Sequence, residues 1–326
     1  TKISKAIAIF GGKTPHPQSI VVGGITSVAD MLNPQRLNDF LFVIKEASDF
    51  INRAYIPDMK LLANAYKEEL INKSGKTQGN YFCVGGYSIN SEKNLFSSGV
   101  IFDNDFSNIK EFDSSKIKEE VQRAWYSDDE NQEPFYTDLN EDGTLKTKNK
   151  EDKYSWIKAP RYDGYTMETG PVARLFISYL KKNTAINSFV DDFLKDTKIE
   201  LGHFNSTIGR NCARAIESQY ICEYIFKLVS NLIQNIKYYD TNTWDKYSFE
   251  DLEKEASGYA FLEVPRGVLL HSLNIKDSKI KNYQIIAPTT WNASPKSSDG
   301  QRAAYEEALI GIKINDLSKP LEVLKV

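Results

Sequence analysis

Apolar residues recur every three or four positions in the first part of the chain, which is the spacing of an α-helix. One such pattern covers residues 37–51. It follows Asn33-Pro34, and asparagine is favoured at a helix N-cap and proline at the first helical position. A second helix is predicted over residues 57–70. Before both lies a stretch through Gly24 that is rich in glycine and proline, residues that fix irregular backbone.

The strongest helical pattern covers residues 209–239. One apolar stripe passes through it, formed by Ala213, Ile216, Tyr220, Ile221, Tyr224, Ile225, Leu228, Leu232 and Ile236. At about 1.5 Å per residue this helix would exceed roughly 40 Å, enough to cross a whole domain. Shorter helices are predicted over residues 171–180, 187–194 and 301–311.

Strands are predicted in two regions. Between residues 74 and 154, short apolar runs at 81–84 and 99–102 lie between turns. This region ends in a charged segment with few aliphatic side chains. Near the C-terminus three runs predict an antiparallel meander, over residues 259–264, 268–275 and 281–287.

The C-terminal strands also predict that two loops meet. A turn about Ser278 sets Leu269 opposite Ala287, so that Arg266 lies near the Thr289-Thr290 pair, provided that the register does not slip. The corner would contain a guanidinium group, two hydroxyls and prolines that remove backbone donors. On this chemistry alone, a paired surface arginine at a strand end is the more frequent outcome.

Composition excludes several classes of protein. Hydrophobic residues make up 41% of the chain and charged residues 26%, which is ordinary for a soluble globular protein of one to three domains. A net charge of −3 gives no electrostatic reason to expect nucleic acid as a partner. No apolar run approaches the roughly 20 residues that span a bilayer. The start at Thr1, without an initiator methionine or signal peptide, is typical of a segment inside a longer gene.

The three cysteines, Cys83, Cys212 and Cys222, form no C-x-x-C pair. Cys212 and Cys222 are too far apart along one predicted helix to form a disulfide bond. We therefore expect three free thiols with structural roles.

Five blocks, in this order, resemble the large subunit of nickel-iron hydrogenases, the enzymes that split or form dihydrogen. The blocks are Phe10-Gly11-Gly12-Lys13-Thr14-Pro15-His16-Pro17-Gln18, residues 153–174, residues 206–217, Glu263-Val264-Pro265-Arg266-Gly267 and Pro288-Thr289-Thr290-Trp291-Asn292. In that family two C-x-x-C pairs, one near each end of the subunit, hold the metals. Because neither pair occurs here, the resemblance implies the interior of such a subunit without its nickel-iron cysteine ligands.

The resemblance implies roles for the two C-terminal loops. Arg266 would face the open coordination position between nickel and iron. Thr289 would donate a hydrogen bond to an iron-bound cyanide, and Pro265 and Pro288 would form the apolar pocket around the CO and CN ligands. A planar donor that is always charged offsets an anionic metal cluster. Whether a guanidine or a cysteine thiolate is the base for H–H cleavage stays open, and that thiolate is not in this chain.

Three further residues follow from the resemblance. Ile285 matches the position whose backbone carbonyl binds a structural Mg²⁺ ion. His271 is either a hydrogen-bond donor behind the metal ligands or a hydrogen-bonded core histidine. His16 lies in the segment that meets the small subunit near its proximal cluster, with a plain turn histidine as the alternative.

The implied fold is multidomain α and α+β, a long-helix bundle with small antiparallel sheets that is incomplete at both ends. We divide it into an interface segment with helices (1–73), an α+β excursion (74–154) and a bundle portion whose C-terminal meander lines the metal site (155–326). Asn52-Arg53-Ala54-Tyr55-Ile56-Pro57-Asp58 favours the respiratory uptake group. The implied partners are an iron-sulfur small subunit and, indirectly, a membrane cytochrome b, on the periplasmic side of the cytoplasmic membrane.

Two alternatives remain. One is a metal-free relative such as the quinone-site subunit of respiratory complex I, and the other is a remnant that only docks a small subunit. The two C-terminal motifs argue against the first, because they suit an iron that carries cyanide.

We predict that these 326 residues alone hold no nickel-iron centre, because soft sulfur ligands define that site. The purified chain should therefore not reduce methyl viologen with H₂. Hydrogen-dependent reduction of the dye would contradict this prediction.

Overall fold

The computed structural model describes residues 2–27, 33–90, 93–126, 140–142, 144, 146–147, 152–238, 241–245, 255–312, 314, 316, 318 and 319. Contacts divide the chain into two compact units. The first unit comprises residues 1–59 and 215–253, and the second comprises residues 60–214 and 254–326. These units follow contacts and not sequence order, and the three-part division into 1–73, 74–154 and 155–326 stays a prediction.

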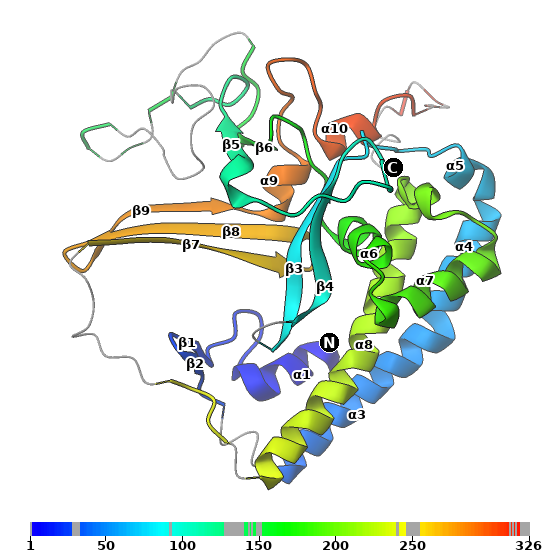
Figure 1. Cartoon of the computed structure of the whole chain (residues 1–326), viewed down its shortest axis with the longest axis vertical. Helices are drawn as coiled ribbons and strands as arrows, with labels where there is room; N and C mark the ends of the chain where they lie inside the picture. The colour runs from blue at the N-terminus through cyan, green and yellow to red at the C-terminus, as the bar shows by residue number, and fades with distance from the viewer. Residues whose placement is uncertain are drawn as a thin grey trace. The chain divides into compact units, whose positions relative to one another are not determined.

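The first unit is helical with one short hairpin. Its elements are α1 (Lys2–Gly11), β1 (Ile20–Val21), β2 (Gly24–Ile25), α3 (Pro34–Phe50), the π-helix η1 (Ile51–Tyr55) and α8 (Thr207–Lys237) from residue 215 onward. Within it α1 packs on α3, and α8 runs beside α3 (Figure 1). Ala6, Ile44 and Cys222 are the buried residues of this contact.

Helix α3 begins where the sequence predicts. The side-chain oxygen of Asn33 accepts the backbone N–H groups of Gln35 at 3.0 Å and Arg36 at 3.4 Å. These bonds satisfy two of the donors that every helix start leaves without an intrahelical partner. The two helices predicted from the sequence are not separated by a loop, because η1 joins α3 directly to α4 (Ile56–Ala65).

The second unit contains the other elements. They are α4 from residue 60, α5 (Lys67–Ile71), β3 (Tyr81–Asn90), β4 (Lys93–Ile101), η2 (Ser114–Lys116), β5 (Ile117–Glu120), β6 (Ala159–Tyr162), α6 (Pro171–Leu180), α7 (Thr184–Thr197), η3 (Leu201–Phe204), the first turns of α8, β7 (Glu255–Val264), β8 (Gly267–Lys276), β9 (Lys279–Ile286), α9 (Pro288–Asn292) and α10 (Ala304–Ala308). Its sheets are small and antiparallel (Figure 1). The predicted combination of long helices and small antiparallel sheets is confirmed.

The meander β7–β8–β9 has the register predicted at its inner end. Leu270 pairs with Ile286, and this register continued sets Leu269 opposite Ala287. The register slips only at the outer end, between Asn274 and Ile275. The turn at residues 265–266 and the start of α9 therefore emerge side by side.

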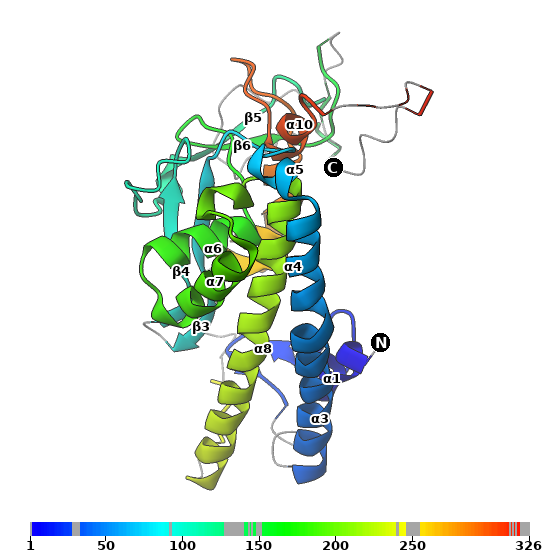
Figure 2. The ribbon, with the colours of Figure 1, turned by 90° about the vertical axis from the view of Figure 1, so that its right-hand side faces the viewer.

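One face of the meander closes the core of the second unit. Val268, Leu270 and Ile286 are buried there together with Phe82 of β3 and Trp291 of α9, whose ring centroids lie 4.7 Å apart. Helix α6 lies against the β3–β4 hairpin, and α7 packs on α6 (Figure 2). Because α6 is buried along most of its length, its N-terminus is fixed at the inner end of the sheet.

Two helix predictions need correction. The helix predicted over residues 57–70 breaks at Tyr66, whose backbone leaves the helical region, so that α4 and α5 are separate. The helix predicted over 301–311 shrinks to the five residues of α10. Its predicted start is extended instead, because Gln301 bonds to Asp299 and the carbonyl of Arg302 accepts a side-chain N–H from Gln78. In the described part of the chain, no helix combines the length and apolar character needed to cross a membrane.

Candidate functional site

Three segments of the second unit meet at the inner end of the meander. They are residues 264–267, which we call the Arg266 loop, residues 168–171, which lead into α6, and α9, which reaches the corner with its last residue, Asn292. They contribute to a cavity of about 520 Å³, which we call the arginine cavity. Its lining includes Arg210, Arg214, Arg266, Glu168, Asn292 and Tyr305.

Thr169 and Asn292 connect these segments by buried hydrogen bonds. The Asn292 amide accepts the backbone N–H of Thr169 and donates to its carbonyl, both at 3.0 Å. The Thr169 hydroxyl oxygen accepts the N–H of Val268 at 2.9 Å. The start of α6, the start of β8 and α9 therefore share one hydrogen-bond network.

Two glycines let the backbones of the Arg266 loop and residues 168–171 touch. Gly170 has φ +128° and Gly267 has φ +133°, backbone conformations that residues with a side chain rarely adopt. A Cβ on Gly170 would lie 2.9 Å from the carbonyl oxygen of Arg266, and a Cβ on Gly267 would lie 2.6 Å from a methyl carbon of Thr169. Neither glycine can be replaced without moving the Arg266 loop.

A buried ion pair lies directly behind the Arg266 loop. An Arg174 nitrogen approaches a Glu263 carboxylate oxygen at 2.7 Å, and both side chains are 0% exposed. The Arg174 guanidinium also donates to the carbonyls of Val264 and Pro265, each at 3.0 Å. The second Glu263 oxygen accepts the N–H of Val84 in β3 at 3.0 Å. This pair therefore links α6, β3 and the end of β7.

The Arg266 side chain differs from the other two arginines of the cavity. It is exposed, and its guanidinium forms no hydrogen bond or ion pair with any residue that the structure describes. Arg210 instead makes a bidentate pair with Glu168 at 2.6 and 3.0 Å, and Arg214 donates to Asn211 at 3.0 Å. Arg266 thus offers charge and N–H donors to a group that enters the cavity.

Glu168 is the buried anion of this cavity. Besides Arg210, it accepts the Thr77 hydroxyl at 2.8 Å. Burial, and then the nearby Glu168 charge, raise the pKa of Tyr81 well above its usual value. No local sequence pattern indicates the Glu168–Arg210 pair, because its members are 42 positions apart.

The other predicted site residues of the second unit lie partly at the inner end of the meander and partly farther along its strands. Pro265 and Thr289 are exposed, whereas Pro288 is buried as the first residue of α9. His271 lies farther along β8, opposite Ile285, and its Nδ1 is 2.5 Å from the hydroxyl of Tyr283. The arginine cavity is lined by neither of these two facing residues.

His16 belongs to the first unit. It is exposed and has a left-handed backbone with φ +52° in the glycine- and proline-rich segment. That backbone is typical of a turn.

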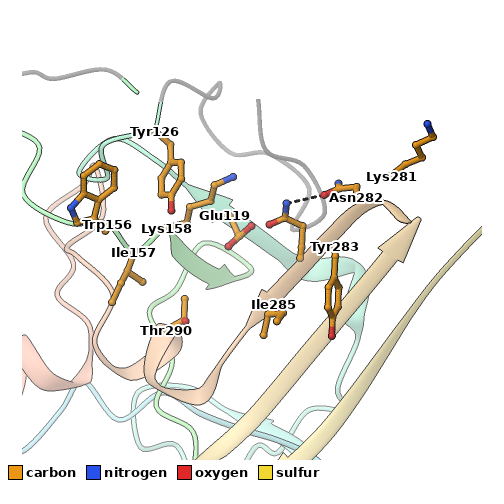
Figure 3. Close-up of a pocket in the computed structure, with 11 residues that line it drawn as sticks. Glu119, Tyr126, Trp156, Ile157, Lys158, Lys281, Asn282, Tyr283, Ile285 and Thr290 are labelled. Atoms are coloured by element: carbon orange, nitrogen blue, oxygen red, sulfur yellow. Dashed lines mark hydrogen bonds between the residues drawn. The ribbon is translucent and has the colours of Figure 1, made fainter. Parts of the chain in front are cut away.

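A second cavity, of about 450 Å³, lies beside the edge strand β9 and is called the β9 cavity here. Figure 3 shows Ile285 and Thr290 on one side and Glu119, Lys158 and Tyr126 on the other. The ammonium of Lys158 lies 5.3 Å from the centre of the Tyr126 ring. Glu119 and Lys158 are buried charged side chains, so the cavity is polar as well as aromatic.

The cysteines are free and buried, as expected. Burial raises the pKa of Cys212 to about 12, and burial followed by the charge of Glu263 raises the pKa of Cys83. Since the thiolate is the metal-binding form, these residues are poor ligands. Across the described ranges, no group of three or more His, Cys, Asp or Glu side chains could hold a metal ion.

Comparison with known proteins finds a family that matches the whole chain. A family model described as nickel-dependent hydrogenase matches residues 1–326. The quinone-reactive Ni/Fe-hydrogenase large chain of Wolinella succinogenes is 39% identical, over 99% of this chain and 58% of that relative. The uptake hydrogenase large subunit of Rhizobium leguminosarum bv. viciae is 36% identical, over 99% and 59% respectively.

Solved structures agree. The reduced, active Ni-Fe-Se hydrogenase from Desulfomicrobium baculatum superposes with a TM-score of 0.82 at 29% identity, covering 99% of this chain and 63% of that one. A [NiFeSe] hydrogenase variant from Desulfovibrio vulgaris Hildenborough gives 0.80 at 32% identity, covering 99% and 64%. The chain thus spans a little under two thirds of the proteins that it matches.

We predict that Thr169→Val destabilises the second unit by about 1–3 kcal/mol, because the buried N–H of Val268 loses its acceptor while the side-chain shape is kept. Urea unfolding of the chain measures the loss. Thr169→Ser keeps the hydroxyl and should cost clearly less. Equal losses in both variants would show that the hydroxyl does not matter.

We also predict that the thiols are inert in the folded chain. Iodoacetamide at mildly alkaline pH should modify none of them until urea is added, after which all three react. Folding raises the pKa of Cys212 from 9.0 to about 12, so the folded chain favours the neutral thiol. The contribution of this thiol to stability is therefore complete below pH 9 and is lost as the pH rises from 9.0 to about 12. Rapid alkylation of the folded chain would be inconsistent with this burial.

Proposed function

The chain belongs to the nickel-dependent hydrogenase family, and we propose that it forms part of the catalytic large subunit of a nickel-iron hydrogenase. The reaction proposed for the complete subunit is the reversible oxidation of H₂ to protons and electrons. The chain covers 58% of the length of the Wolinella succinogenes large chain. Within the reaction, we assign to this chain the wall of the active site that carries charge and excludes water.

The observation that carries the proposal is the guanidinium of Arg266 in the arginine cavity, which has no partner among the residues that the structure describes. A nickel-iron centre with CO and CN ligands, when bound, supplies the chemistry that breaks the H–H bond. Arg266 offsets negative charge there and donates N–H groups, which a preformed site does without reorganisation. Pro265 would present apolar surface and Thr289 a hydroxyl donor, since both side chains are exposed, whereas Pro288 is buried as the first residue of α9.

The chain's own residues do not fit the metal as ligands. Cys83 is buried on β3, whereas Cys212 and Cys222 are buried ten positions apart on α8, and no soft donor set converges in the described residues. We therefore assign no metal-ligand role to Cys83, Cys212 or Cys222. The absence of activity predicted for these 326 residues follows from the same fact.

A structural Mg²⁺ ion at the carbonyl of Ile285 is the second part of the proposal. The β9 cavity supports it, because Glu119 and Gln284 line the same space and carry the oxygen donors that Mg²⁺ prefers. Among the described strands β9 also lies at an edge of its sheet, so its carbonyls that do not pair with β8 point outward. His271 would then act from the neighbouring strand as a partner of Tyr283.

We further propose an iron-sulfur small subunit as the electron-accepting partner, with His16 on the docking side. A membrane cytochrome b would receive the electrons indirectly, on the periplasmic side of the cytoplasmic membrane. The support is the family and the names of the similar proteins, which include a quinone-reactive hydrogenase and uptake hydrogenases.

In the complete large subunit with its partner, Arg266→Lys should lower H₂-dependent reduction of methyl viologen by about 10²–10³-fold, because lysine keeps the charge but loses the planar donor fork. Nickel content should stay unchanged. Arg123→Lys, the same change at a surface ion pair with Asp152, is the matched control and should keep full activity. Full activity of the Arg266 variant, or a complete subunit without nickel, would refute the proposed function.

A further inference from the structure

The Arg266 loop combines a fixed backbone with a free side chain. Its guanidinium has no partner in the described part of the chain, yet the peptide groups before it are held from behind. A lone exposed arginine at a strand end has no need of such a scaffold. The contacts that hold this backbone therefore indicate that the position of the Arg266 charge is important.

Arg174 is the residue that holds these peptide groups. One of its terminal nitrogens contacts both Glu263 and the carbonyl of Val264, and the other donates to the carbonyl of Pro265. Planar guanidinium geometry allows these contacts to be made together, which a lysine ammonium on its flexible stem does not reproduce. The two carbonyls that precede Arg266 are thus tied to one buried cation.

Glu263 fixes Arg174 in turn. Its side chain is 0% exposed and spans from Arg174 to the backbone N–H of Val84. A Cβ on Gly86 would lie 2.6 Å from the Glu263 Cβ, so β3 packs closely against this carboxylate. Because a buried charge without its partner is costly, neither member of the pair can turn away.

On the opposite side of the loop the backbone of Gly170 lies close to the Arg266 carbonyl, because a Cβ added at Gly170 would lie 2.9 Å from that oxygen. The backbone at Arg266 is therefore confined by hydrogen bonds on one side and by steric contact on the other. Confinement of this kind is what a preorganised electrostatic site requires.

We propose that Arg174 and Glu263 are a positioning pair for Arg266. They hold the backbone from which the Arg266 guanidinium extends into the arginine cavity. The geometric part of this inference stands without any hydrogenase activity, whereas its consequence for catalysis rests on the proposed function.

The test compares variants of the whole chain by ¹⁵N relaxation of the Arg266 and Gly267 backbone amides, after selective labelling with ¹⁵N-arginine and ¹⁵N-glycine. In the wild type their order parameters should be about 0.85, the value of rigid backbone. In Arg174→Lys and Glu263→Gln they should fall toward about 0.6 or below, as for flexible backbone. Thermal unfolding is recorded for every variant.

Arg161→Lys is the matched control. Arg161 is a second buried arginine of the same unit, and its guanidinium bonds to Ser294, Ser297 and the carbonyls of Pro160 and Pro295, none of them in the Arg266 loop. This variant should also lower the melting temperature, because it disturbs a buried cation. It should leave the order parameters of Arg266 and Gly267 unchanged. If Arg174 had a purely structural role, Arg174→Lys and Arg161→Lys would affect these order parameters alike.

The double variant Arg174→Gln with Glu263→Gln decides the outcome if a single variant does not fold. It removes both charges together, so that no unpaired charge remains buried. Rigid amides at Arg266 and Gly267 in this folded variant would overturn the proposal. Loss of order there, with the Arg161 control intact, supports the positioning pair even where the complete enzyme proves inactive.

Discussion

The ion pair between Arg174 and Glu263 is the constraint on which the second unit depends. Two charges with no exposed surface are tolerated only when they are paired and their remaining hydrogen-bonding atoms are satisfied. Here the remaining partners are backbone groups of β3 and of the Arg266 loop. This one ion pair therefore joins α6, β3 and β7, and the Arg266 loop lies next to it.

Buried and exposed arginines serve opposite purposes in this unit. Arg174 and Arg161 use their donors on the protein itself, and Arg161 does so with hydroxyl and carbonyl oxygens alone. Burial accordingly lowers the pKa of Arg161 to about 10, while more distant carboxylates oppose the shift. The guanidinium of Arg266, by contrast, has no partner in the described ranges of the chain. A site that receives an anionic group requires an unpaired cation on a rigid scaffold, and the paired arginines belong to that scaffold here.

Local sequence patterns predicted much of the fold because their causes are local. The Asn33 cap, the bounds of α6 at residues 171–180 and the register that sets Leu269 opposite Ala287 each follow from neighbouring residues or from one turn. Predictions were weaker where distant contacts compete with propensity. The short α10 is an example, since Gln301 and Arg302 bond to groups outside the helix. The roles of Arg266 and its neighbours came from resemblance to a family and stay predictions.

The sequence by itself determined the family, the small antiparallel sheets and the meeting of the two C-terminal loops, because motifs, alternation and turn position are written in consecutive residues. Tertiary structure alone decided which of these arginines has no partner among the described residues. Arg174, Arg210 and Arg266 look alike in sequence, but Glu263 and Glu168, 89 and 42 positions away, neutralise the first two. Such pairings depend on how the elements pack, since desolvation forces a buried charge to find whichever partner the fold brings near.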